Sequence, residues 1–173
     1  MTSAPDILIR PAVDADGPAL ADLIRAVFAE YEDCPFVPEE FPELAAPASA
    51  FAARNGAMWV AERGGAVVGS LAIAPNQDPG VFELFKVYVA GPERGGGLSA
   101  RLLERAIAFA RAGGGRRIAL WSDSRFTRGH AFYLKHGFRR VAGIRALHDA
   151  GVTLEFGFAR DLGPGPALAA RAS

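Results

Sequence analysis

The sequence is poor in lysine and in cysteine. Lys86 and Lys135 are its only lysines, and 19 basic residues are matched by 19 acidic residues, so the formal net charge is zero. Nucleic-acid binding through phosphate contacts needs an excess of positive charge, which this chain lacks. The single cysteine, Cys34, cannot form an internal disulfide. We therefore expect a cytoplasmic protein with no nucleic-acid partner.

Long apolar runs, metal-binding clusters and repeats are also missing. No apolar run approaches the ~20 residues of a membrane span, and residues 1–5 lack the pattern that opens a signal segment. His130 and His136 are six residues apart and do not share a helix face, which leaves no evident ligand set for a metal. These shortages predict no membrane partner and no metal cofactor.

The composition is typical of one globular domain. The chain has 173 residues, of which 50% are hydrophobic and 22% are charged. A chain of this size can bury a full core without disulfides. We expect an N-terminal tail over 1–6, a single domain over 7–162 and a flexible C-terminal tail over 163–173.

The apolar patterns predict an α+β fold rather than a regular alternation of strands and helices. A helix capped by Asp14 or Asp16 is followed by proline-rich residues 33–47, which we expect to be mostly loop. The order of elements indicates a mixed central sheet of about six or seven strands flanked by about four helices. Strands are predicted at 7–10, 58–61, 66–73, 81–89, 116–121, 139–147 and 152–159, and further helices at 48–54, 98–109 and 127–136.

A glycine-rich turn follows the predicted strand 81–89 and leads directly into a helix. Its sequence is Arg94-Gly-Gly-Gly-Leu-Ser99. Glycines let a backbone come close to a ligand, and the free N–H groups at a helix start attract phosphate. Arg94 adds a positive charge beside them. The turn therefore indicates an anion site, with a connector that binds nothing as the alternative.

A dinucleotide-binding loop is a second interpretation of the same turn. Gly95, Gly97 and Ala100 match that fingerprint, and Asp123 lies just after the next predicted strand. The fingerprint should open a series of parallel βαβ units, however, whereas this loop follows a meander of three predicted strands. The context therefore disfavours a dinucleotide.

Two segments together resemble the GNAT superfamily of acyl-CoA N-acyltransferases. The family's loop pattern, Gln/Arg-x-x-Gly-x-Gly/Ala, corresponds to Arg94 through Ser99, with serine in place of the final small residue. Its second pattern, roughly Ala-x-x-Leu/Phe-Tyr-x-x-x-Gly-Phe, corresponds to residues 129–138, with glycine in place of the first alanine. Tyr133 follows Arg94 by 39 residues, which hold one helix and one strand as the family requires. The span 7–160 follows the family's order of elements.

The resemblance implies acetyl-CoA as co-substrate. The pyrophosphate would lie at the glycine turn, and a bulge in strand 81–89 would free backbone groups for the acyl carbonyl and the pantetheine arm. Phe126 stands where many members carry an asparagine that contacts the cofactor. The cofactor-binding residues implied are Val87, Tyr88, Val89, Arg94, Gly95, Gly96, Gly97, Leu98, Ser99 and Ala100.

Acyl transfer from a thioester to an amine also needs an acid and a base. The resemblance places Tyr133 at the thioester, where its hydroxyl could protonate the leaving thiolate; a buried packing role is the alternative. Glu83 is an acid within an apolar strand, where some members carry a catalytic glutamate. Burial would raise its pKa toward a useful value. A structural position for Glu83, with water as the proton carrier, is the alternative.

The sequence therefore predicts an N-acetyltransferase that uses acetyl-CoA and a primary amine of a small molecule or peptide in a ternary complex. The alternatives are a catalytically inactive CoA-binding module of the same fold and, less favoured, a dinucleotide-binding enzyme. A homodimer is compatible with the sequence. Residues 26–53 hold no Lys or Arg and six acids, which would favour a cationic acceptor. These acids are Glu30, Glu32, Asp33, Glu39, Glu40 and Glu43.

Overall fold

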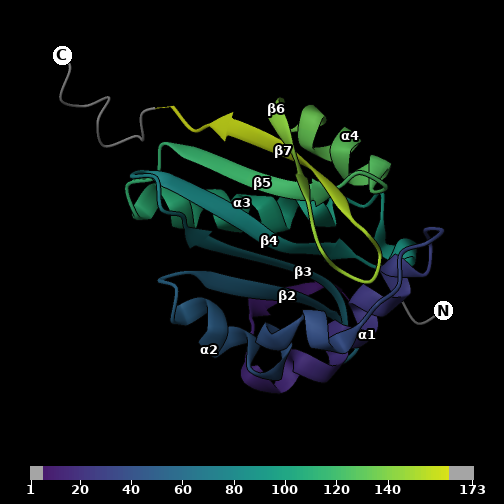
Figure 1. Cartoon of the computed structure of the whole chain (residues 1–173). Coiled ribbons are helices and arrows are strands. Elements are labelled where there is room, and N and C mark those ends of the chain that lie inside the picture. The colour runs from purple at the N-terminus through teal and green to yellow at the C-terminus, as the bar shows by residue number, and fades with distance from the viewer. Residues whose placement is uncertain (1–5, 164–173) are drawn as a thin grey trace, which may run out of the picture.

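The sheet is mixed and has seven strands in the order β1-β2-β3-β4-β5-β7-β6 in a computed structural model that describes residues 6–163 (Figure 1). Every neighbouring pair is antiparallel except β4 and β5, which are parallel. The predicted α+β sheet is confirmed, and the single parallel pair does not fit a dinucleotide fold. The strands are β1 (Leu8–Pro11), β2 (Ala57–Arg63), β3 (Ala66–Pro75), β4 (Val81–Val89), β5 (Arg117–Asp123), β6 (Arg139–Ala146) and β7 (Leu154–Asp161).

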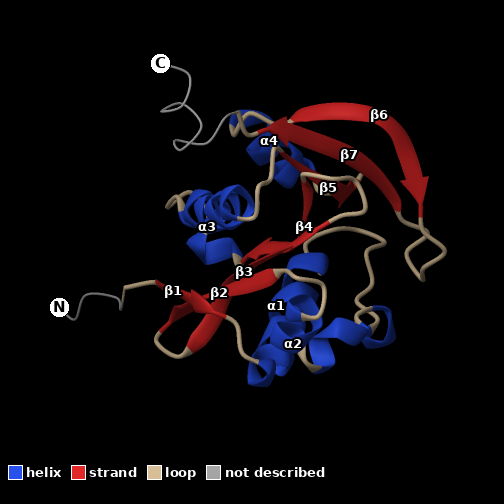
Figure 2. Cartoon of the chain, turned by 90° about the vertical axis from the view of Figure 1, so that its left-hand side faces the viewer, coloured by secondary structure: helices blue, strands red, loops and turns tan. Residues whose placement is uncertain are grey.

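Helices cover both faces of the sheet. Figure 2 shows α1 (Gly17–Phe28) and α2 (Pro47–Ala52) on one face, and α3 (Leu98–Ala112) and α4 (Thr127–Lys135) on the other. The region predicted as loop, 33–47, contains two short 3-10 turns, Pro38–Glu40 and Pro42–Ala45. The predicted tails fall largely outside the described residues.

Each face of the sheet buries its own apolar cluster. On one face, Leu20 and Ile24 of α1 are fully buried against Val60 and Ala72 of the sheet. On the other, α3 buries Leu98, Leu102 and Ala106, as its apolar spacing predicted. Burial of these two stripes fixes both helices to the sheet and so fixes the loops that lead into and out of them.

The N-terminal cap of α1 differs from the prediction. Asp16 is buried, and its carboxylate accepts two hydrogen bonds from Arg10, at 2.8 and 2.9 Å, and one from the Val13 amide, at 2.8 Å. It makes no capping hydrogen bond to α1. Asp14 binds Ser49 of α2 instead, through the backbone amide at 2.8 Å and the hydroxyl at 2.5 Å. Ion pairing outcompetes local capping here because the buried Asp16 needs a counter-charge.

Two irregularities of β4 position the functional region. The strand pairs with β5 only over Val81–Glu83, so the two parallel strands separate toward their carboxyl ends. On its other edge, β4 bulges: Ser70 of β3 pairs with Tyr88 and Ala72 pairs with Phe85, which leaves two β4 residues opposite one. Lys86, within this bulge, has a left-handed φ of 52°, and its carbonyl accepts a 2.7 Å hydrogen bond from the Ser70 hydroxyl. The bulge implied by the family resemblance is present.

Candidate active site

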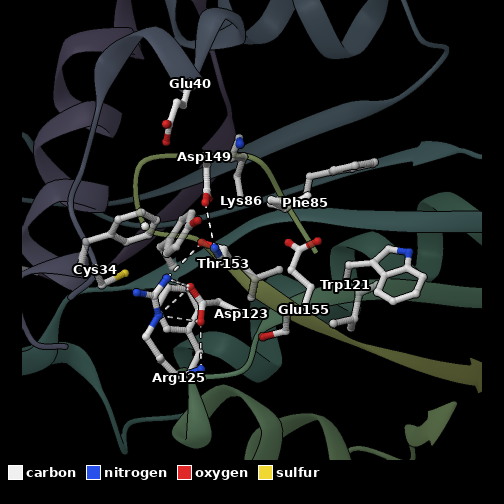
Figure 3. Close-up of a pocket in the computed structure, with 18 of the residues that line it drawn as sticks. Cys34, Glu40, Phe85, Lys86, Trp121, Asp123, Arg125, Asp149, Thr153 and Glu155 are labelled. Atoms are coloured by element: carbon white, nitrogen blue, oxygen red, sulfur yellow. Dashed lines mark hydrogen bonds and ion pairs between the residues drawn. The ribbon is translucent and has the colours of Figure 1, made fainter. Parts of the chain in front are cut away.

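The separation of β4 from β5 opens two cavities, one on each side of the gap. The glycine-loop cavity, of about 510 Å³, lies between the end of β4, the start of α3 and α4. The aromatic cavity, of about 290 Å³, lies between β4, β5 and the segment that joins β6 to β7 (Figure 3). The second is lined by the aromatic side chains Phe28, Phe41, Phe85, Tyr88, Trp121, Phe126 and Tyr133.

Nearly all of the predicted cofactor-binding residues line the glycine-loop cavity. Of these, only Gly96 is not among its lining residues. Gly95 and Gly97 have left-handed φ angles of 83° and 80°, and a Cβ added to either would meet no atom within 4 Å. Only glycine adopts this backbone at low cost and leaves this space open. No side chain caps α3, so its first amides are free to meet an anion.

Arg94, a lining residue of this cavity, is paired with the acid Glu30. Its Nη1 and Nη2 donate to Glu30 at 2.6 and 2.9 Å, and its Nε donates to the Val89 carbonyl at 3.1 Å. Arg128 at the start of α4 reaches the same carboxylate at 3.0 Å. Hydrogen bonding from Arg94, followed by the charges of both arginines, lowers the pKa of Glu30. Two guanidinium groups thus flank the glycine turn and share one counter-ion.

Both cations that line the aromatic cavity, Lys86 and Arg125, are held in ion pairs. Arg125 holds both carboxylate oxygens of Asp123, at 2.9 and 2.6 Å, and donates to Thr153 at 3.0 Å. Lys86 pairs with Glu43 and lies 4.6 Å from the Phe41 ring centroid. These pairs satisfy the cations of the lining and fix the walls of the cavity.

The two cavities meet at a small set of residues, of which Tyr133 is the most deeply buried aromatic residue. Its side chain is 6% exposed and packs against Phe138 and Phe158, with ring centroids at 5.6 and 5.7 Å. Its hydroxyl makes no hydrogen bond to any described residue, although it belongs to the lining of both cavities. Burial raises its pKa, so the hydroxyl stays protonated at neutral pH. The residues that line both cavities are Val87, Tyr88, Ser122, Phe126 and Tyr133.

Glu83 lies at the base of the gap, where β4 and β5 still pair. It is partly buried, and this burial, with the negative charge of Glu155, raises its pKa, while Arg145 and Arg54 oppose the shift. A hydrogen bond with Asn76 also opposes it. The raised pKa agrees with the sequence argument. Glu83 is not, however, among the lining residues of either cavity, so a proton would have to reach it through water or another group.

The six acids of residues 26–53 do not act together. Glu30 is paired with Arg94, Glu43 is paired with Lys86, and only Glu40 of the six lines the aromatic cavity. The acidic character of that cavity comes instead from Asp123, Asp149 and Glu155, in addition to Glu40. The acidic groups of the cavity therefore come mostly from the end of β5, the segment between β6 and β7 and the start of β7, and not from residues 26–53.

Comparison with known proteins agrees with this geometry. The family model "Acetyltransferase (GNAT) family" matches residues 24–138, more than half of the chain. The chain belongs to the GNAT acetyltransferase family. It is 33% identical over 131 residues to the uncharacterized N-acetyltransferase YjgM of Escherichia coli, with 73% of this chain and 78% of that protein covered. It is 31% identical over 108 residues to N-acetyltransferase 8F1 of Rattus norvegicus, with 54% of this chain covered but only 49% of the rat protein.

Solved GNAT structures share the fold. An acetyltransferase of the family from Staphylococcus aureus superposes with a TM-score of 0.78 at 19% identity, covering 91% of this chain and 99% of that one. YncA, a putative acetyltransferase from Salmonella typhimurium solved with acetyl-CoA, gives a TM-score of 0.68 at 20% identity, covering 92% and 96%. Identities this low establish the fold alone.

Within residues 6–163, no helix is both long and apolar enough to cross a membrane. The same residues contain no group of three or more His, Cys, Asp or Glu side chains arranged to hold a metal ion.

Several residues of the site carry no local sequence signal. Ser122 and Glu155 line the aromatic cavity because β5 ends and β7 begins there, and that placement depends on long-range strand pairing. Tyr88 was predicted only for the cofactor, yet its side chain faces both cavities. Tyr88 could have been suggested by its place near the end of a predicted strand, but nothing local distinguishes Tyr88 or Glu155 from packing residues.

Proposed function

We propose that this GNAT-family protein is an N-acetyltransferase that moves the acetyl group of acetyl-CoA to a primary amine in a ternary complex. The observation that carries the proposal is the Tyr133 hydroxyl, which has no partner among the described residues and lies where the two cavities meet. A donor group at such a junction is suited to a thioester in one cavity and an amine in the other.

The glycine-loop cavity fits the phosphates and pantetheine arm of acetyl-CoA. The open space above Gly95 and Gly97, the free amides of the first turn of α3 and the nearby Arg94 form an anion site of the expected chemistry. Arg94 would exchange Glu30 for the pyrophosphate. Val87, Tyr88 and Val89 would border the pantetheine arm, since the β5-facing edge of β4 has no strand partner beyond Glu83.

The proposed reaction is a direct attack. The amine nitrogen forms a bond to the thioester carbonyl carbon, the carbon–sulfur bond breaks, and Tyr133 gives its hydroxyl proton to the departing thiolate. One proton leaves the attacking ammonium before attack, and a second leaves the nitrogen afterwards and restores the tyrosine. Free backbone amides at the bulge would hold the carbonyl oxygen as it gains charge.

We assign Glu83 as the group that takes the first proton, through water. Its burial and raised pKa make it a stronger base than an exposed glutamate. The acceptor is proposed to be a small cationic amine, because acids outnumber bases in the lining of the aromatic cavity.

A thermal unfolding comparison tests the cofactor assignment. Acetyl-CoA at one hundred times its dissociation constant should stabilise the protein by about 2.7 kcal/mol and raise its Tm, whereas NADP⁺ should leave the Tm unchanged. A shift with NADP⁺ alone would overturn the proposal. Turnover with an amine panel then distinguishes an enzyme from a CoA-binding module, since only the enzyme releases CoA when an amine is added.

A further inference from the structure

Glu155 presents a free carboxylate oxygen to the aromatic cavity. Its side chain is 14% exposed, and its Oε2 accepts both Nε and Nη2 of Arg145, each at 2.6 Å. Its Oε1 accepts no hydrogen bond from any described residue. In Figure 3 the carboxylate of Glu155 points into the cavity, with Phe85 and Trp121 near it in the view. Arg145 therefore holds this carboxylate in place and leaves one oxygen available.

The other acids of the lining are less available. Asp123 has both oxygens bound by Arg125. Asp149 accepts the Thr153 amide at 2.8 Å, and Glu40 is an exposed side chain that accepts the Ala150 amide at 2.8 Å. Glu155 is the acid of this lining whose carboxylate is anchored by a guanidinium group through one oxygen while its other oxygen stays unoccupied. Its negative charge also contributes, after burial, to the raised pKa of Tyr88, a residue that lines both cavities.

The cations of the same lining are not available for an anion. Lys86 is bound to Glu43, and Arg125 is bound to Asp123, Thr153 and the carbonyl of Asp33. If an acceptor carried a carboxylate beside its amine, that carboxylate would have to break one of these ion pairs. Otherwise it would lie near the negative charge of Glu155 without a cationic partner. Either event costs free energy, because a buried charge without a partner is unfavourable.

The remaining walls of the cavity are apolar and aromatic. Phe28 packs against Phe41 and Phe126 at centroid distances of 5.8 and 5.6 Å, and Phe85 and Trp121 complete the lining. A cavity of about 290 Å³ with such walls suits a single ring or a short branched chain rather than a peptide. The cavity thus offers one anionic contact and a compact apolar surface.

We propose that Glu155 binds the ammonium group of the acceptor through Oε1, and that the acceptor is a primary amine on a compact aromatic or apolar body without a carboxylate. This inference rests on the proposed function, because it names the substrate class of the same site. Glu155 determines specificity by binding; the proton and acetyl transfers remain those of the proposed reaction. Tyr133 and Glu83 keep the roles given to them above.

Two acceptors that differ in one group test the substrate class. 2-Phenylethylamine and phenylalanine share the ring, the chain and the amine, but only phenylalanine carries a carboxylate. The unmodified protein with saturating acetyl-CoA should show kcat/KM for 2-phenylethylamine at least tenfold higher than for phenylalanine. Equal use of the two, or a preference for phenylalanine, would overturn the inference while CoA release itself would still support the proposed function.

The variant Glu155→Gln tests the residue. A hydrogen bond to a charged group contributes about 1.5–3 kcal/mol, so the variant should raise the KM for 2-phenylethylamine roughly 10- to 100-fold. The KM for acetyl-CoA should not change, and the dependence of the amine KM on salt should weaken. Glu155→Asp should recover part of the loss, and the matched control Glu39→Gln, an exposed acid outside both linings, should behave as the unmodified protein.

The outcomes of this test separate the two proposals. An unchanged amine KM in Glu155→Gln, with normal CoA release, overturns the role of Glu155 and leaves the proposed function standing. A KM for acetyl-CoA that rises together with the amine KM also overturns it, because the change would then reflect general disruption. If the unmodified protein neither binds acetyl-CoA nor releases CoA with any amine, the proposed function fails, and the inference fails with it. Thermal unfolding of each variant shows whether it is folded.

Discussion

Arg94, which lines the glycine-loop cavity, forms a two-point ion pair with Glu30, with N–O distances of 2.6 and 2.9 Å. Glu30 also accepts a hydrogen bond from Nη2 of Arg128 at 3.0 Å. One carboxylate is therefore shared by two arginines that line the glycine-loop cavity. Any phosphate that binds to Arg94 has to compete with this carboxylate.

Glu30→Gln should tighten acetyl-CoA binding. The variant removes a negative charge beside a polyanionic ligand and frees Arg94, while exposed ion pairs of this kind contribute only about 0.2–1 kcal/mol. We expect the Kd for acetyl-CoA, measured by titration calorimetry at low salt, to fall roughly two- to fivefold. Glu32→Gln, an exposed acid two residues away that lines neither cavity, is the control. Weaker binding in Glu30→Gln would mean that Glu30 positions Arg94 rather than competing for it.

Gly97→Asp should abolish acetyl-CoA binding while the protein stays folded. A negative side chain at the start of α3 repels phosphate and fills the open space above the turn. The left-handed backbone costs about 1–2 kcal/mol, which a stable domain tolerates. Gly114→Asp is the matched control, because Gly114 also has a left-handed φ, 77°, and open space but lies at the far end of α3. Loss of binding in both variants would point to strain instead of charge.

Tyr133→Phe should lower kcat roughly 10²–10⁴-fold with little change in the Kd for acetyl-CoA. The substitution keeps the ring that packs against Phe138 and Phe158 and removes only the hydroxyl. Because burial raises the pKa of Tyr133 above its usual value, its ionisation should not limit the unmodified protein below about pH 10. Steady-state kinetics across pH check both points. Turnover equal to that of the unmodified protein would reduce Tyr133 to a packing residue.

Glu83→Gln should move the activity to higher pH. Burial raises the pKa of Glu83, so in the unmodified protein the rate should rise as pH rises through a value above the usual range of glutamate. Without this base the amine must lose its proton unaided, and alkylamines have pKa values near ~10. The pH dependence of kcat/KM measures the change. An identical profile in the variant would show that the proton leaves by another route.

Local patterns in the sequence predicted much of this architecture. The apolar spacing of Leu98, Leu102 and Ala106 located α3, and the glycines before it located the turn, because both depend on short-range geometry. The bulge at Lys86 followed from family resemblance alone, since no residue type there demands it. The ion pair between Arg94 and Glu30 could not be predicted, because 64 residues separate the two partners.

The acceptor side of the site was the least predictable part. The acids that stand out in the sequence, over residues 26–53, are largely paired or exposed, whereas Glu155 looks unremarkable within its strand. Its position follows from the pairing of β7 with β5, which sets Glu155 opposite Asp123. Charge counted along a segment therefore says less about a cavity than the register of the strands that form it.

The most direct test of the central claim is a two-product measurement with acetyl-CoA and 2-phenylethylamine. Free CoA and the N-acetylated amine are quantified together, the second by mass spectrometry, with either substrate omitted as a control. The account predicts that both products appear in equal amounts, only when both substrates are present, and that Tyr133→Phe suppresses both. Binding of acetyl-CoA without CoA release, across a panel of primary amines, would contradict it and would make the protein a CoA-binding module.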